Sequence, residues 1–407
     1  MERERPRWEV ADVICAHGEE LRQRHPLSAA HEKVLRHIAT CRTAALGGHL
    51  DVCDTCAYEH NSYNSCRDRH CPKCQATERA RWIAERTERL LPVPCFHVVF
   101  TLPSELRPLA LRNKAPLYDL LFRAASSTLR RLARDPKRLG ADIGVTAVLH
   151  TWGQDMHFHP HLHCIVTGGG LALDGSHWMP SRSNYFLPVA VLAKLFRGSF
   201  LAGLEQARKE GKLDFAGSTA EIADPVRWAA LRDGLYRKDW RVYAKPPFGG
   251  PEQVLRYLGG YTHRVAISNH RLASLKNGKV TFTYKDYEDR SRRKTMALDA
   301  VEFLRRFLLH VLPQGFVRIR HYGIWAARNV NTKLAVAKRM LASEPVDVQG
   351  AAPTKKEKPW WERFLEHTGI DVRSCPQCKS GRLQRTRPIQ VTTTAWRRPP
   401  PPVARSP

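Results

Sequence analysis

The sequence predicts an α+β fold in which helices flank a central antiparallel sheet, preceded by a small zinc-binding module. Strand patterns at residues 143–151 and 158–167 lie a few residues apart, which indicates an antiparallel hairpin. Helical patterns separate further strand patterns, which is typical of an α+β domain rather than a doubly wound one. A segment between residues 41 and 75 is rich in cysteine and histidine and poor in apolar periodicity, which predicts the module.

Composition points to a polyanionic partner. The chain has 407 residues, of which 43% are hydrophobic, so a wholly disordered chain is excluded and two or three domains are expected. It carries 66 Lys and Arg against 39 Asp and Glu, a net charge of +27. Such a charge opposes compaction and is typical of proteins that neutralise nucleic-acid phosphates. A membrane surface is disfavoured, because no lysine-rich amphipathic helix is evident.

Targeting signals are absent from the sequence pattern. The start, MERERPRWEV, lacks the apolar region of a secretory signal, and no stretch of about 18 apolar residues predicts a membrane span. We therefore expect a cytoplasmic protein without membrane contact. In that compartment disulfides are rare, and eight of the 11 cysteines lie in tight clusters, which favours metal binding.

Four regions follow one another along the chain. Residues 1–40 are expected to be helical, because Ser28 precedes a helix with Val34, Leu35 and Ile38 on one face. The zinc-binding module covers 41–91 and ends in a charged helix at 76–90. The main body covers 92–345, and a basic, proline-rich region at 346–407 is expected to be partly disordered.

Within the body, each element follows from its apolar spacing or its start signal. Leucines at helical spacing predict a helix over 116–132, and Pro225 after Asp224 is typical of a helix start. Further helices are predicted at 188–210, 225–240 and 299–310, with another that opens at Pro251. Strands are predicted at 95–101, 143–151, 158–167, 240–244, 265–268, 280–285 and 294–298.

The cysteine module predicts structural zinc. Cys53 and Cys56 form one Cys-x-x-Cys pair, and Cys71 and Cys74 form another, separated by 14 residues. Two such pairs can close a tetrahedral thiolate site, and the metal would supply the folding free energy of so short a segment. Spare donors surround these pairs. A second zinc at Cys41, His49, Cys66 and His70 is an open alternative, whereas His60 is a further spare donor.

A further Cys-x-x-Cys pair stands near the C-terminus. Cys375 and Cys378 form half of a metal site, and the sequence offers no evident partner pair for them. The pattern is therefore weak evidence for metal.

Alternating histidines mark the strand at 158–167. Alternate residues of a strand share a face, so His161 and His163 project together and Leu162 turns toward the core. Two such imidazoles form a good platform for a divalent ion with open positions. If the turn is centred near residues 155 and 156, His150 lies opposite His161 as a third ligand. Gln154 and His159 are the alternatives.

Two tyrosines follow in the run GGPEQVLRYLGGYTHRV. Tyr257 and Tyr261 are four residues apart, so a helix would present both hydroxyls on one face. Gly259 and Gly260 between them argue against plain packing, because glycine costs about 1 kcal/mol inside a helix. A tyrosine phenol can attack a phosphodiester, and an ion on the histidines would polarise the phosphate. The pair therefore predicts covalent DNA chemistry.

HPHLHCIVTGGG followed by YLGGYTHRVAISNHRL resembles the two-tyrosine HUH transposases of the insertion sequence 91 family. SYNSCRDRHCPKCQ resembles that family's zinc-binding domain, and the similarity covers residues 25–330 in order. The resemblance implies a five-stranded antiparallel sheet, His161 and His163 as the metal pair for Mg or Mn, and Tyr257 and Tyr261 as nucleophiles. It further implies rolling-circle transposition of single-stranded DNA through a 5′-phosphotyrosine, in bacteria, at the nucleoid.

Two other interpretations stay open. Plasmid replication initiators and conjugative relaxases also combine paired histidines with tyrosine. The zinc module and the absence of a Walker motif favour a transposase, since Gly168, Gly169 and Gly170 lack the Lys-Ser/Thr that cradles phosphate. A non-catalytic zinc DNA-binding protein is the alternative from another class, and it would never become covalently attached to DNA.

Overall fold

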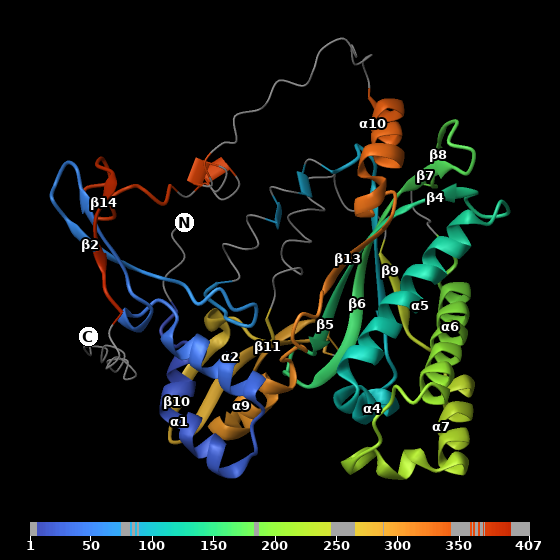
Figure 1. Ribbon diagram of the computed structural model, residues 1–407, viewed down its shortest axis with the longest axis horizontal. Helices are drawn as coiled ribbons and strands as arrows, with labels where there is room; N and C mark the ends of the chain where they lie inside the picture. The colour runs from blue at the N-terminus through green and yellow to red at the C-terminus, as the bar shows by residue number, and fades with distance from the viewer. Residues whose placement is uncertain are drawn as a thin grey trace.

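The computed structural model describes residues 6–74, 82–83, 86–87, 89–182, 187–245, 265–287, 289–342, 359, 361–362, 365–366, 369 and 371–391. It combines helices with antiparallel sheets, which confirms the predicted α+β class (Figure 1). The expected helix that opens at Pro251 lies outside the described residues, as does most of the expected helix at 76–90. Among the described helices, none is long and apolar enough to cross a membrane.

A five-stranded antiparallel sheet forms the centre of the body. Its strand order is β13-β5-β6-β3-β9, and every neighbouring pair is antiparallel. The two strands β5 and β6 are the predicted hairpin. The bounds are β3 (Cys95–Thr101), β5 (Gly144–Trp152), β6 (Phe158–Thr167), β9 (Val242–Lys245) and β13 (Ile319–Gly323).

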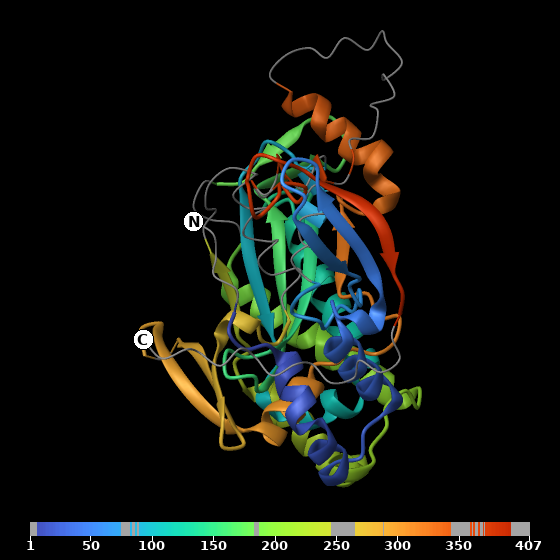
Figure 2. The ribbon, with the colours of Figure 1, turned by 90° about the vertical axis from the view of Figure 1, so that its left-hand side faces the viewer.

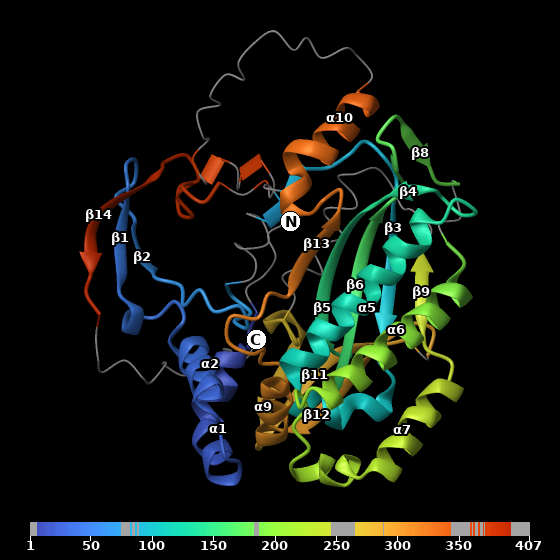
Figure 3. The same cartoon turned by 45° about the vertical axis from the view of Figure 1, so that its right-hand side comes forward.

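Helices cover one face of this sheet, as Figures 1 and 3 show for α5 and α6. Their apolar faces share one core with the alternate strand residues Phe100, Leu162 and Cys164. The side chains between these residues along each strand therefore point to the other face of the sheet. The helices are α4 (Arg107–Arg112), α5 (Lys114–Arg134), α6 (Val189–Lys209) and α7 (Pro225–Arg237).

A second core joins the N-terminus to a later part of the chain. The helices α1 (Val10–Arg24) and α2 (Ala29–Thr40) pack with α9 (Ala300–Leu309) and a meander of three strands. Ser28 caps α2 by accepting a hydrogen bond from the His31 amide at 3.3 Å, as its sequence position predicted. The meander consists of β10 (Leu272–Lys276), β11 (Lys279–Asp286) and β12 (Arg292–Asp299). The expected strand at 265–268 is wrong, because the first strand of the meander begins only at Leu272.

Smaller elements complete the body. A third core includes Trp325 and Leu334, which pack with Ile165 on the sheet face opposite the helices. The elements are β4 (Ala141–Asp142), β7 (Gly169–Ala172), β8 (Trp178–Pro180), α10 (Ala335–Leu341), the π-helix η6 (Val330–Leu334) and the 3-10 helices η2 (Ser104–Leu106), η3 (Gly217–Ala223), η4 (Asn269–Arg271) and η5 (Ala327–Asn329). A further 3-10 helix, η1 (Ala44–Leu46), belongs to the N-terminal module.

A further sheet joins the two ends of the sequence. Strands β1 (Gly48–Cys53) and β2 (Glu59–Tyr63) form a hairpin, and β14 (Leu383–Ile389) pairs with β1 in antiparallel register. Figure 2 shows β14, in red, lying along the blue hairpin. Residues 346–407 were expected to be a basic, proline-rich region that is partly disordered. Residues 383–389 of this region form a strand that pairs with the N-terminal module.

Candidate metal centre and cysteine sites

Three histidines meet where β5 and β6 pair. His150 lies directly opposite His161 in the register that the sequence predicted. His163 is two residues further along the same strand and therefore shares their face. Within the described residues, the three side chains offer ligand nitrogens that all lie within 4.8 Å of one another. This arrangement can hold one metal ion.

Packing on the opposite face fixes that arrangement. Leu162 and Cys164 are buried in the core under the helices, so their strand neighbours must project the other way. A slip of one residue would turn the histidines into that apolar core, and the register is therefore strongly specified. His150 and His163 are only 3% and 8% exposed.

Hydrogen bonds orient two of the rings. Nδ1 of His161 lies 2.7 Å from the carbonyl oxygen of His159, so it carries the proton and donates to that oxygen. Nδ1 of His163 lies 2.8 Å from Nε2 of His97. The Nε2 atoms of His161 and His163 are left facing each other at 3.1 Å. The Nε2 atoms of His161 and His163 therefore point toward a common position, as the nitrogens of metal-ligating histidines do.

The electrostatics also suit a cation. Burial lowers the pKa of His161 to about 4, so its imidazole is neutral near neutral pH and keeps a lone pair. Burial, followed by the charges of Lys245 and His161, lowers the pKa of His97 to about 4 as well. A neutral imidazole with a free lone pair fits a divalent metal ion.

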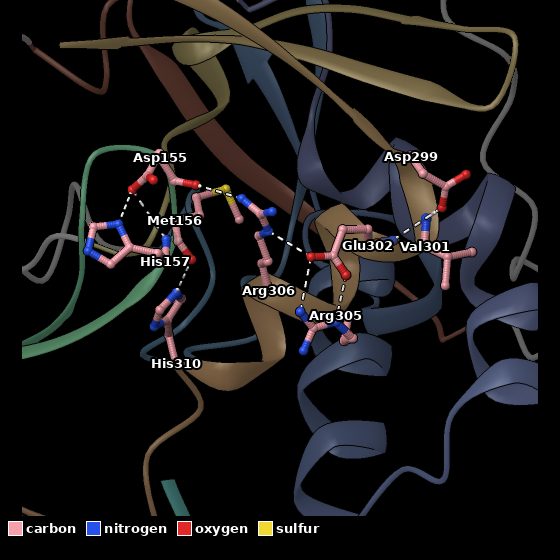
Figure 4. A network of polar contacts seen from close by, with 9 residues as sticks. All are labelled: Asp155, Met156, His157, Asp299, Val301, Glu302, Arg305, Arg306 and His310. Carbon is pink, nitrogen blue, oxygen red and sulfur yellow. Dashed lines mark hydrogen bonds and ion pairs between the residues drawn. The ribbon is translucent and has the colours of Figure 1, made fainter. Parts of the chain in front are cut away.

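The tip of the histidine hairpin is tied to α9 (Figure 4). His310 Nε2 lies 3.0 Å from the carbonyl oxygen of Met156, and Arg306 Nη1 donates to that of Asp155 at 3.5 Å. Met156 is fully buried in the second core. The turn that sets the register of the histidines is therefore anchored to the core that α1 and α2 share with α9.

The alternative third ligands, Gln154 and His159, make other contacts. Gln154 is in this turn, where its carbonyl oxygen accepts a hydrogen bond from Arg271 Nη2. His159 is next to His161, with ring centroids 5.2 Å apart, but it is outside the group of converging nitrogens. Of the two histidine candidates, His150 is the one whose ligand nitrogen converges with those of His161 and His163.

Tyr257 and Tyr261 lie outside the described residues. The residues on either side of their segment are described. Lys245, which ends β9, lies opposite His97 in the sheet. Val265 lines a small cavity together with Thr151 and Trp152, next to His150 along β5.

One residue of this site could not be singled out from the sequence. His97 lies on β3 within the apolar run CFHVVF, where an isolated histidine has no visible partner in the sequence. The structure stacks its ring on His163, with centroids 5.0 Å apart and planes within 6°. The pairing of β3 with β6 brings His97 to His163, and the sequence alone does not show this pairing.

The cysteines group differently from the expectation. Cys53 and Cys56 are not brought to Cys71 and Cys74, so the predicted four-ligand set is corrected. Cys41 and Cys66 instead complete the site of the second pair. Their sulfurs each lie 3.5 Å from that of Cys74. The first group is Cys41, Cys66, Cys71 and Cys74.

The expected second set of Cys41, His49, Cys66 and His70 is not formed. His70 accepts a hydrogen bond from the Leu312 amide at 3.2 Å and contacts Asp68 at 3.0 Å. His49 lies on β1, where its Nε2 is 3.3 Å from Asp51. His60 lies on β2, in neither cysteine group. The second four-cysteine group is Cys53, Cys56, Cys375 and Cys378.

Comparison with known proteins identifies a class. A family model described as "Putative transposase" matches residues 144–333, which include the histidine hairpin, and one described as "Transposase zinc-binding domain" matches residues 13–102. DNA transposases cut and bind DNA, so the chain has a DNA-cleaving, DNA-binding role.

Two curated relatives narrow the class. "Putative transposase y4qJ" of Sinorhizobium fredii is 48% identical over 376 residues, which cover 92% of this chain and 94% of that protein. "Transposase for insertion sequence element IS801" of Pseudomonas savastanoi pv. phaseolicola is 31% identical over 303 residues, 73% of this chain and 70% of that protein. The chain belongs to the insertion sequence 91 family of transposases and carries that family's N-terminal zinc-binding domain.

Proposed function

We propose that this transposase nicks and rejoins single-stranded DNA, with Tyr257 and Tyr261 as nucleophiles beside a divalent metal ion held by His150, His161 and His163. The observation that carries the proposal is the convergence of three imidazole nitrogens on one sheet face. The tyrosine motif downstream supplies the nucleophiles.

In the proposed reaction a tyrosine phenolate oxygen attacks phosphorus. The new O–P bond replaces the bond to the 3′ oxygen of the upstream nucleotide, which leaves with a proton as a free 3′ hydroxyl. The downstream strand stays attached through its 5′ phosphate. Attack by another 3′ hydroxyl reverses the exchange and rejoins DNA. The ion, Mg or Mn, supplies positive charge beside the phosphate when bound.

The ends of the tyrosine segment support this placement. Lys245 precedes the segment and lies opposite His97 in the sheet. Val265 follows the segment and lines the small cavity beside Trp152. Trp152 is on β5 and Lys245 is on β9, and strand β6, which carries His161 and His163, lies between β5 and β9 in the strand order. Only 19 residues join Lys245 to Val265, so the tyrosines stay within reach of the site.

The same face offers groups that suit a single strand. Tyr243 on β9 lies opposite Val99 and is 55% exposed, and it shares the face of Lys245 and His97. An exposed aromatic ring next to a cation is typical of surfaces on which unpaired bases stack. The net charge of +27 favours the phosphates.

A labelled-oligonucleotide assay tests the proposal. A single-stranded oligonucleotide from the element's end is given a 3′ label in one sample and a 5′ label in another. We expect a denaturation-resistant protein adduct from the 3′ label and a shortened free strand from the 5′ label. The duplex should give little of either product. Absence of the adduct would contradict the proposal and favour the interpretation as a non-catalytic zinc DNA-binding protein. The match to a transposase family disfavours the interpretation as a replication initiator or relaxase.

We further propose that Cys41, Cys66, Cys71 and Cys74 hold the structural zinc of the zinc-binding domain. Four thiolates at about 2.3 Å from zinc place their sulfurs about 3.8 Å apart in a tetrahedron. The two distances of 3.5 Å fit such a site. Cys41 directly follows α2, whereas the other three cysteines follow β2. A metal bound to all four would hold these two parts of the chain together.

His97 is expected to position the metal ligand His163. Its Nε2 and the His163 Nδ1 fix the ring of His163, so His97→Ala should weaken Mn²⁺ binding about 10- to 100-fold. His97→Gln, which keeps a hydrogen-bonding group, should restore part of the affinity. Titration calorimetry with Mn²⁺ measures this, and His159→Ala is the matched control on the same face. Equal affinity in His97→Ala and the unaltered protein would contradict the role.

A further inference from the structure

We propose that Cys53, Cys56, Cys375 and Cys378 form a second structural zinc site, which clasps the C-terminal segment onto the N-terminal module. The matched zinc-binding domain ends at residue 102, so Cys375 and Cys378 lie outside it. The proposal is independent of the nuclease chemistry.

The sulfur positions match a tetrahedral site. Cys53 Sγ lies 3.7 Å from Cys378 Sγ, and Cys56 Sγ lies 3.7 Å from Cys375 Sγ. All four sulfurs lie within 4.8 Å of one another. Zinc with four thiolates requires separations of about 3.8 Å. The cysteines are free thiols rather than disulfides, so four soft donors converge with no bond among them.

The two Cys-x-x-Cys turns have the same backbone design. The amide of Ala57 donates to the Cys53 carbonyl at 3.2 Å, and the amide of Lys379 donates to the Cys375 carbonyl at 3.1 Å. Both donors directly follow the second cysteine of their pair. Both have positive φ, at 57° for Ala57 and 64° for Lys379. Residues with side chains rarely adopt this conformation, so the two turns share an uncommon backbone shape.

Backbone amides also point at the sulfurs. The Thr55 amide lies 3.4 Å from Cys53 Sγ, and the Gly381 amide lies 3.2 Å from Cys378 Sγ. Such hydrogen bonds stabilise thiolates, the form that binds metal. Gly381 also leaves the room that the site needs, because a Cβ there would lie 2.4 Å from Cys53 Sγ.

Hydrogen bonds beside the cysteines seat the C-terminal segment. The Asp54 amide donates to the Arg382 carbonyl at 3.1 Å, and the Arg382 amide donates to Asp54 Oδ1 at 2.8 Å. From there β14 runs along β1, from the pair Cys53 and Leu383 to the pair Gly48 and Ile389. This strand exposes Arg385 and Arg387, so the clasp adds positive charge to the N-terminal module.

Zinc counting on the full-length chain tests the clasp. We expect two zinc ions per chain in the unaltered protein, after removal of free metal, by elemental analysis. Cys375→Ser/Cys378→Ser should retain one, and so should Cys71→Ser/Cys74→Ser, which disables the other site. Cys15→Ser, a thiol exposed on α1 outside both groups, is the control and should retain two. One zinc in the unaltered protein, or two in Cys375→Ser/Cys378→Ser, would overturn the proposal.

Alkylation of thiols gives a second measurement, which begins with the unaltered protein before and after chelation. In the zinc-loaded protein Cys375 and Cys378 should resist iodoacetamide, as located by mass spectrometry, and should react after chelation. In Cys53→Ser/Cys56→Ser they should react at once, while Cys71 and Cys74 stay protected. Rapid alkylation of Cys375 and Cys378 in the zinc-loaded protein would refute the site. Adduct formation on DNA reports separately on the nuclease proposal.

Discussion

Tyr257→Phe is expected to remove almost all covalent adduct on a substrate with one cleavage site, by at least about 10³-fold. Phenylalanine keeps the ring but lacks the oxygen that attacks phosphorus. Tyr261→Phe should still form that adduct and fail in the second strand transfer. The 3′-labelled oligonucleotide measures the first step, and joining to a second oligonucleotide measures the other.

The expected order rests on the sequence around the two tyrosines. On the helix that the sequence predicts, the residues are four apart, about 6 Å along the axis, so only one phenol can be in line with a given phosphate. Tyr257 precedes Gly259 and Gly260, whereas Tyr261 follows them. Tyr243→Phe, which removes a hydroxyl from the neighbouring strand β9, is the matched control. Equal adduct from both single variants, with loss only in the double variant, would show the tyrosines to be interchangeable.

His161→Ala/His163→Ala is expected to abolish nicking, again by at least about 10³-fold, while binding to single-stranded DNA persists. The two rings supply the facing Nε2 atoms of the proposed metal site, and without them the ion has no platform. Binding should survive because the net charge of +27 is the excess of Lys and Arg over Asp and Glu and does not include these two rings. Gel shift measures binding, and the adduct assay with added Mn²⁺ measures nicking.

Two controls make this result specific. His159→Ala removes the neighbouring ring on the same face and should retain nicking, since His159 contacts His161 through its backbone carbonyl. His150→Ala should also lose most nicking activity, because His150 is the proposed third ligand of the metal. Full activity in His150→Ala would instead assign that position to Gln154 or His159. Nicking that persists both in His161→Ala/His163→Ala and in the presence of EDTA would exclude a catalytic metal.

Local sequence predicted the histidine hairpin well. A strand has a side-chain period of two, and a turn centred near residues 155 and 156 predicts His150 opposite His161. The structure has this register. Leu162 and Cys164 are alternate residues of the strand, and their burial in the core defines which face of the sheet the helices cover. His97 was missed because its partner lies 66 residues away, on a strand whose pairing with β3 the sequence does not state.

Cysteine spacing could not decide which pairs share a metal. Cys53–Cys56 and Cys71–Cys74 have a spacing that suits one zinc, but the fold assigns each pair to another partner. The true partner of Cys56 stands 319 residues away, and no local rule reaches so far. The same is true of β14, because LQRTRPI lacks apolar alternation and becomes a strand by pairing with β1.

The joining of residue 53 to residue 378 has a consequence for how the protein is made. A ribosome adds about 5 to 20 residues per second, so the 325 residues between these cysteines take roughly 15 to 65 seconds to synthesise. For most of that time the first Cys-x-x-Cys turn has left the ribosome, while the strand and thiols that complete it do not yet exist. The N-terminal module is therefore completed only after residues 92–345 have been synthesised, although its own sequence precedes them. A chain that stops before residue 383 lacks β14, so the sheet of the N-terminal module is complete only in chains whose synthesis has passed this strand.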